Sequence, residues 1–226
     1  MPACLPFNQG VLAKLPWPEL GSLGALEELN LAANKIMMIP DAAFAGLSSL
    51  KVLSINDNRL VRLGSLRPLR CLEELRLYNN SLEEMPEIGP MAHLTIFELN
   101  KNRVSSIPAD YFSKTPALVK LAMPGNMLEA VPASLASCAS LQFLQLQENR
   151  LAAFEDATWH ALAKLETLFL QGNPGLAVPV GLGQCAGLKR INVPTAPDDL
   201  AAIFETLAMA APGGVYWDSH GAAHKK

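Results

Sequence analysis

The sequence lacks the long apolar runs that cross membranes, because asparagine or a charged residue interrupts every apolar stretch. We therefore predict no membrane insertion. Neither sign of charge is in large excess, since the net charge is −3 and the pI is about 5.8. This balance gives no electrostatic reason to expect a nucleic acid or an anionic membrane surface as partner. Half of the residues are apolar, which is ample material for a continuous core.

Cysteine is sparse and scattered, at Cys4, Cys71, Cys138 and Cys185. No C-x-x-C pair occurs, so the spacing of a structural zinc site is missing. We interpret all four as small buried apolar residues. The start of the chain also lacks the basic and apolar regions of a secretion signal. Isolated cysteines and this start predict an intracellular, cytoplasmic protein.

Catalytic motifs are missing as well. No Walker loop, G-x-S-x-G, H-E-x-x-H or G-x-G-x-x-G motif occurs in a credible context. Ser48 and Lys51 have serine–lysine spacing, but they flank a predicted core leucine. Asp156 and His160 have helical spacing without a third metal ligand. We expect no catalytic, cofactor-binding or metal-binding residues, and hence no enzyme.

What the chain does contain is one eleven-residue phrase in seven near-copies, the last slightly broken. The copies span 26–36, 50–60, 72–82, 94–104, 118–128, 141–151 and 165–175. Each follows L-x-x-L-x-L-x-x-N-x-L, and the first leucines of successive copies lie 22 to 24 residues apart. A period of this kind indicates a solenoid in which each repeat packs against its neighbours.

Each phrase predicts a short strand followed by a turn. Apolar residues at the fourth and sixth positions indicate a strand with one buried face, and one strand per repeat predicts a parallel sheet. The asparagine at the ninth position has an amide that donates and accepts, so it can satisfy backbone groups inside the turn. We predict a structural asparagine ladder of Asn34, Asn58, Asn80, Asn102, Asn126, Asn149 and Asn173.

The phrase resembles the leucine-rich repeat superfamily, and the mixed repeat lengths resemble its intracellular type. The resemblance implies an α/β solenoid that curves as a right-handed superhelix. It places a parallel β-sheet on the concave face, short helical turns on the convex face and a helical cap at the C-terminal end. We expect a degenerate N-terminal capping repeat over 1–25, leucine-rich repeats over 26–194, and a C-terminal helical cap and tail over 195–226.

Odd-numbered strand positions face the concave side and are free of core constraints. Phe143 and Phe169 then lie diagonally on neighbouring strands, about 7–8 Å apart. Large aromatic residues on such a face favour an interface hot spot. The predicted partner-binding residues are Phe143, Phe169, Gln145, Gln147, Gln171, Arg190, Tyr78, Arg76, Glu74, Glu98 and Lys120.

These features predict a non-enzymatic scaffold or adaptor that binds a protein partner through its concave sheet, as a monomer or in a hetero-complex. Two alternatives stay open. The 22-residue repeats resemble those of protein phosphatase 1 regulatory subunits, which implies a regulatory subunit of a catalytic protein such as a Ser/Thr phosphatase. The chain would otherwise be a structural subunit of a large cytoskeletal, ciliary or organellar assembly.

Overall fold

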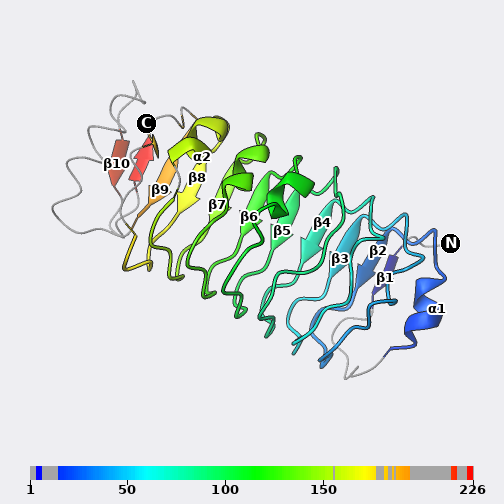
Figure 1. Ribbon diagram of the computed structural model, residues 1–226. Coiled ribbons are helices and arrows are strands. Elements are labelled where there is room, and N and C mark those ends of the chain that lie inside the picture. The colour runs from blue at the N-terminus through cyan, green and yellow to red at the C-terminus, as the bar shows by residue number, and fades with distance from the viewer. Residues whose placement is uncertain are drawn as a thin grey trace.

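One short strand from each coil lies beside the next along an elongated solenoid (Figure 1). The computed structural model describes residues 4–6, 15–154, 156–176, 181–182, 185, 187–193, 215–217 and 223–225. The strands form a stepped ribbon, and the connecting segments return behind it (Figure 1). The predicted leucine-rich repeat solenoid is confirmed.

Nine parallel strands form the ribbon within the described residues. They are β1 (Cys4–Pro6), β2 (Glu28–Asn30), β3 (Val52–Ser54), β4 (Glu74–Arg76), β5 (Ile96–Glu98), β6 (Lys120–Ala122), β7 (Phe143–Gln145), β8 (Thr167–Phe169) and β9 (Arg190–Asn192). Neighbouring strands pair at the same repeat position, so Leu53 lies between Leu29 and Leu75. The middle residue of each strand from β2 to β9 is buried, because side chains alternate between the two faces of a strand.

Helical turns cover only part of the convex face. A short helix, α1 (Trp17–Gly21), precedes the first full repeat. Later repeats contribute η1 (Tyr111–Lys114), η2 (Ala133–Ser137) and α2 (Asp156–Ala161). The two 22-residue repeats, over 50–93, are fully described and have no helical turn. The repeat over 26–49 has none either, so helical turns are confined to α1 and to the repeats after residue 110 within the described residues.

The core runs as one cluster through the described coils. Phe44, Phe112 and Trp159 are fully buried between the convex segments and the sheet. Where two 22-residue coils follow a longer one, the backbones come very close. A Cβ atom at Gly64 would lie 2.3 Å from the carbonyl oxygen of Pro40, so only glycine permits this approach.

The asparagines connect successive coils through buried hydrogen bonds. In Asn102, Oδ1 accepts from the backbone N–H of Leu82 at 3.0 Å. Its Nδ2 donates to the carbonyl oxygens of Leu77 at 3.0 Å and Leu99 at 3.1 Å. One side chain thus joins backbone groups of its own coil to those of the preceding coil. The same cross-coil bonds are made by Asn58, Asn80, Asn126, Asn149 and Asn173.

The residue before each asparagine has a left-handed backbone conformation. These residues are Ala33, Asp57, Asn79, Lys101, Gly125, Glu148 and Gly172, with φ between 52° and 72°. The conformation costs a non-glycine residue roughly 1–2 kcal/mol. Such strain persists where surrounding structure over-determines the backbone, and here the asparagine bonds and the sheet do so.

Two antiparallel strands follow β9 at the C-terminal edge of the sheet. The strand β11 (Ala223–Lys225) pairs with β9, and β10 (Val215–Trp217) pairs with β11. The sequence predicted a tail at 223–225, but pairing there satisfies backbone groups of β9 that an open sheet edge would expose. The predicted helix between 195 and 211 lies outside the described residues, as does the segment 7–14 of the N-terminal cap.

The ladder makes a testable claim about two neighbouring asparagines. Replacing Asn102 with Ala should lower the free energy of unfolding by about 3 kcal/mol, because it leaves buried backbone groups unpaired. Asn100 is the matched control, since its buried Oδ1 has no hydrogen-bond partner and Asn100→Ala should leave the free energy of unfolding unchanged or raise it. Urea unfolding followed by circular dichroism measures both. Equal losses would contradict a special role for the ninth position.

Candidate protein-recognition surface

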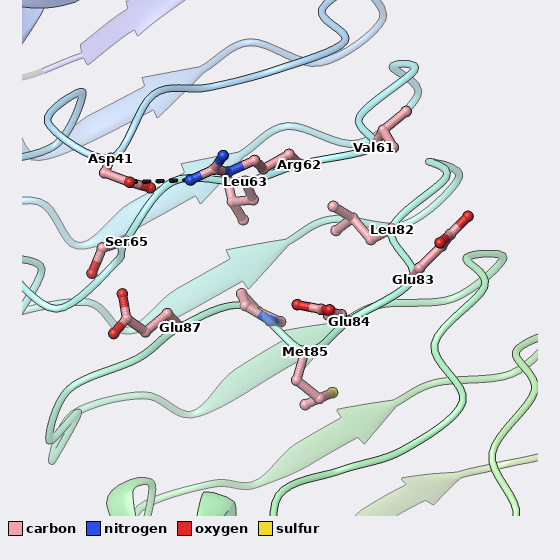
Figure 2. A pocket seen from close by; sticks show the side chains of 11 residues that line it. Asp41, Val61, Arg62, Leu63, Ser65, Leu82, Glu83, Glu84, Met85 and Glu87 are labelled. Carbon is pink, nitrogen blue, oxygen red and sulfur yellow. Dashed lines mark hydrogen bonds and ion pairs between the residues drawn. The ribbon is translucent and has the colours of Figure 1, made fainter.

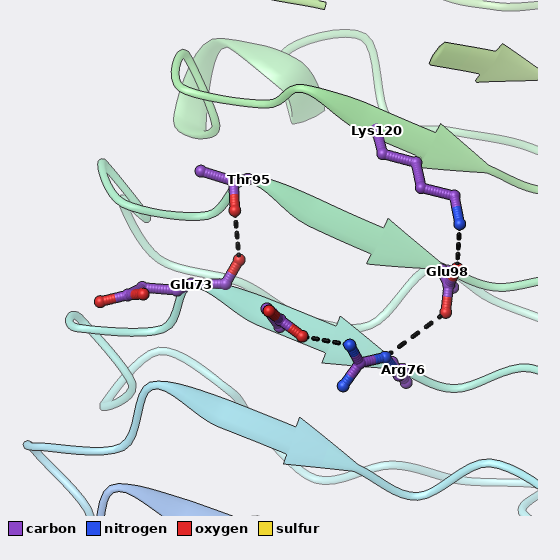
Figure 3. A network of polar contacts seen from close by, with 6 residues as sticks. Glu73, Arg76, Thr95, Glu98 and Lys120 are labelled. Atoms are coloured by element: carbon purple, nitrogen blue, oxygen red, sulfur yellow. Dashed lines mark hydrogen bonds and ion pairs between the residues drawn. The ribbon is translucent and has the colours of Figure 1, made fainter. Parts of the chain in front are cut away.

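The centre of the concave face is a closed charge network across β4, β5 and β6 (Figure 3). Arg76 contacts Glu74 on its own strand, and its Nε lies 3.6 Å from an Oε atom of Glu98. The other carboxylate oxygen of Glu98 accepts a hydrogen bond from Lys120 Nζ at 2.5 Å. The register of the sheet causes this arrangement. Arg76 lies directly opposite Glu98 on the preceding strand, and Lys120 lies diagonal to Glu98 on the following strand.

This network neutralises itself, with two acids and two bases in contact. The side chain of Glu98 is only 14% exposed, so water screens its contacts weakly. Tyr78 lies two residues after Arg76, just past the end of β4. Burial raises the pKa of Tyr78, and the charges of Asp57 and Glu98 add to that shift. Such matched charges select between partners more than they supply affinity.

The two concave phenylalanines occupy the predicted diagonal positions. On β7 and β8, Phe143 pairs with Thr167, and Gln145 pairs with Phe169. Phe143 is 36% exposed, one of few large apolar side chains in the described residues that reach this level. The ring contacts between described residues lie in the core and on the convex side, and none joins Phe143 to Phe169. Arg190 is exposed one strand further on.

Unpaired polar atoms lie beside these rings. The Oε1 atoms of Gln147 and Gln171 are buried and accept no hydrogen bond, and Asn100 Oδ1 is in the same state. All three residues hold the seventh position of their repeats. A buried acceptor without a partner costs about 1–3 kcal/mol. Sequence reasoning placed both glutamines on this face, but only coordinates reveal that their amides are unsatisfied.

The cysteines follow the prediction only in part. Cys138 and Cys185 are buried, and the Sγ of Cys138 lies 3.4 Å from the carbonyl oxygen of Thr115. Burial raises the pKa of the Cys138 thiol to about 11. Cys71 is exposed, so the prediction that it is buried is wrong. It directly precedes the first leucine of its repeat, a position that is exposed or half-buried in every described repeat, whereas Cys138 and Cys185 lie three residues before theirs. The side chain of Cys4 lies outside the described residues.

The described part of the chain contains no group of three or more His, Cys, Asp or Glu side chains arranged to hold a metal ion. None of its helices has the length and apolar character needed to span a membrane.

A family model described as leucine rich repeat matches residues 24–82 and 92–151. This chain belongs to the leucine-rich repeat family. It is similar to osteomodulin of Rattus norvegicus, with 35% identity over 141 residues, covering 61% of this chain and 32% of the relative. Keratocan of Coturnix japonica is 34% identical over 122 residues, covering 51% and 34%. The chain thus spans about a third of the length of these curated relatives.

Solved structures show the same fold. A leucine-rich repeat protein of Leptospira interrogans aligns with a TM-score of 0.68 and 26% identity, covering 91% of this chain and 58% of that one. An internalin of Listeria monocytogenes aligns with a TM-score of 0.66 and 21% identity, covering 85% and 54%. The predicted resemblance to phosphatase regulatory subunits stays a prediction, as does membership of a large assembly.

The predicted cytoplasmic location is contradicted by the relatives. Osteomodulin and keratocan are secreted leucine-rich repeat proteins of the extracellular matrix. The prediction relied on isolated cysteines. A thiol buried in a repeat core packs as a small apolar group in an oxidising or a reducing compartment alike, so its isolation does not identify the compartment. The leucine-rich repeat family and these relatives are non-catalytic, and absence of enzymatic activity in this chain remains a prediction.

The contrast between the cysteines can be measured with a thiol reagent. At pH 8 in native buffer, iodoacetamide should alkylate Cys71 and leave Cys138 unmodified. Cys138 is fully buried, and with a pKa of about 11 only about one thiol in a thousand is ionised at that pH. Peptide mapping by mass spectrometry gives the extent at each site, and a sample unfolded in guanidinium should label both. Equal labelling of the two sites in native buffer would show that the core opens readily.

Proposed function

We propose that this chain is a non-enzymatic recognition module that binds a protein partner on the C-terminal half of its concave face. Leucine-rich repeat proteins are generally protein-interaction modules, which supports the class of function. The secreted relatives support a partner met outside the cell. Because the chain spans about a third of those relatives, it supplies one part of such an interaction surface.

The unsatisfied face around Phe143 carries the proposal. Phe143 presents an aromatic ring on a sheet face that the core does not use. The unpaired amide oxygens of Gln147 and Gln171 belong to residues two positions past the ends of β7 and β8. Each amide can rotate to meet a donor or an acceptor that a partner supplies. Exposed rings beside unpaired amides are stabilised by an interface that covers the rings and completes the hydrogen bonds.

The charge network sets a second condition on the partner. Glu98 already contacts Arg76 and Lys120, so a partner that covers it must keep these ion pairs or replace them with its own charges. Leaving either base unpaired and buried would cost more than the contact gains. The partner surface that fits is therefore apolar over Phe143 and Phe169 and either charge-matched or absent over β4 to β6.

A photoreactive residue can identify the partner and locate its site together. Benzoylphenylalanine placed at Phe169 should cross-link to a partner from extracellular extract, whereas the same group at the exposed Glu129 should not. With the purified partner, Phe143→Ala combined with Phe169→Ala should weaken binding about 30-fold or more, as expected for central aromatic hot spots. Isothermal calorimetry measures the affinity.

Two matched variants separate binding from folding. Leu23→Ala removes an exposed apolar side chain from another part of the chain and should leave affinity unchanged. Gln171→Met removes a buried amide oxygen that has no hydrogen-bond partner. This variant should bind the partner more weakly but keep or raise the midpoint of thermal unfolding. If the double phenylalanine variant binds as tightly as the original chain, the concave site is wrong.

A further inference from the structure

A groove opens on the convex face between the two 22-residue repeats (Figure 2). Side chains of the segments 61–65 and 82–87, together with Asp41, line a cavity of about 480 Å³. We call it the convex groove. It is absent from the sequence prediction, which placed partner-binding residues on the concave face alone.

The lack of helical turns leaves room for this groove. The two repeats over 50–93 have no helical turn, so no helix fills the space between their convex segments. Equivalent positions of the two segments are 22 residues apart, which sets Val61 level with Glu83 and Arg62 level with Glu84. Gly64 lets its backbone approach that of the preceding coil closely, and this holds the first wall in place.

An exposed apolar ridge adjoins the convex groove and reaches it through Val61. Met37, Met38 and Val61 are 59%, 60% and 54% exposed, more than any other large apolar side chain in the described residues. The ridge is continuous, because the N–H of Val61 donates to the carbonyl oxygen of Met37 at 2.9 Å and Met38 pairs with Arg62. Leu63 and Met85 line the groove and are partly buried against the core.

The segment 82–87 supplies the other wall, which carries two carboxylates without an ion pair. Asp41, in the coil before Val61, pairs with Arg62 at 3.2 Å, as Figure 2 shows, and Glu87 pairs with Arg67 at 3.0 Å. Glu83 and Glu84 form no ion pair with any described residue, and both are exposed. Acids alone on a surface would simply be solvated. Here they border an apolar ridge that water covers poorly.

We propose that the convex groove binds an extended segment of a partner protein in which apolar and basic side chains alternate. The apolar side chains would cover Val61 and Met37, and the lysines or arginines would contact Glu83 and Glu84. Alternate side chains of an extended segment point in opposite directions, which matches a groove with one apolar and one acidic wall. The same carboxylates repel nucleic-acid phosphates and anionic lipid headgroups. This site is separate from the concave face.

Defined peptides test the proposal without knowledge of the natural partner. A short fluorescein-labelled peptide that alternates leucine with lysine should bind, whereas its leucine–glutamate counterpart should bind at least about tenfold more weakly. Fluorescence anisotropy measures both, and added salt should weaken the lysine peptide because the acids are exposed. Glu83→Lys combined with Glu84→Lys should reverse the preference between the peptides.

Controls assign the binding to this groove. Val61→Ser combined with Met37→Ser should weaken the lysine peptide several-fold, whereas Glu129→Lys and Phe143→Ala should leave it unchanged. All these residues are exposed, so the circular dichroism of each variant should match the original. The proposal is overturned if the charge-reversed variant still prefers the lysine peptide, or if neither peptide binds the original chain.

Discussion

The hydrogen bonds from each asparagine to the preceding coil are the interaction on which the structure depends. Asn126 accepts the N–H of Val104 and donates to the carbonyl oxygen of Leu99, both in the coil before its own. These backbone groups lie in and beside the turn that follows the strand, and the asparagine is their hydrogen-bond partner. The bonds also hold the preceding residue in a left-handed conformation that would otherwise be strained. The coils are therefore fixed in register one after another.

That register produces both candidate surfaces. On the concave side, it aligns side chains of equal repeat position, which brings Arg76 opposite Glu98 and sets Phe143 diagonal to Phe169. On the convex side, three of the later repeats carry the helical turns η1, η2 and α2, whereas the two 22-residue repeats have none and leave the convex groove open. The chain can thus present two separate sites on one rigid support.

Much of the fold and of the concave face could be predicted, because the position of a residue within the repeat determines where its side chain lies in the coil. The strands, the asparagine turns and the diagonal phenylalanines all follow from a side-chain period of two and a fixed coil. The exposure of Cys71 was missed because Cys71 directly precedes the first leucine of its repeat, a position that is buried in none of the described repeats. The pairing of β11 with β9 was also missed, since Ala223–Lys225 shows no alternation of apolar residues. The cellular compartment of the chain does not follow from the way its core packs.

The most direct measurement of the central claim is hydrogen exchange at the backbone amides that have an asparagine side chain as acceptor. The N–H groups of Val104 and Leu128 each donate to an asparagine of the following coil, at 3.0 Å in both cases. If these bonds hold the stack together, both amides should exchange as slowly as that of Leu121 in the sheet, through global unfolding alone. Exchange at the rate of exposed loop amides would contradict the account.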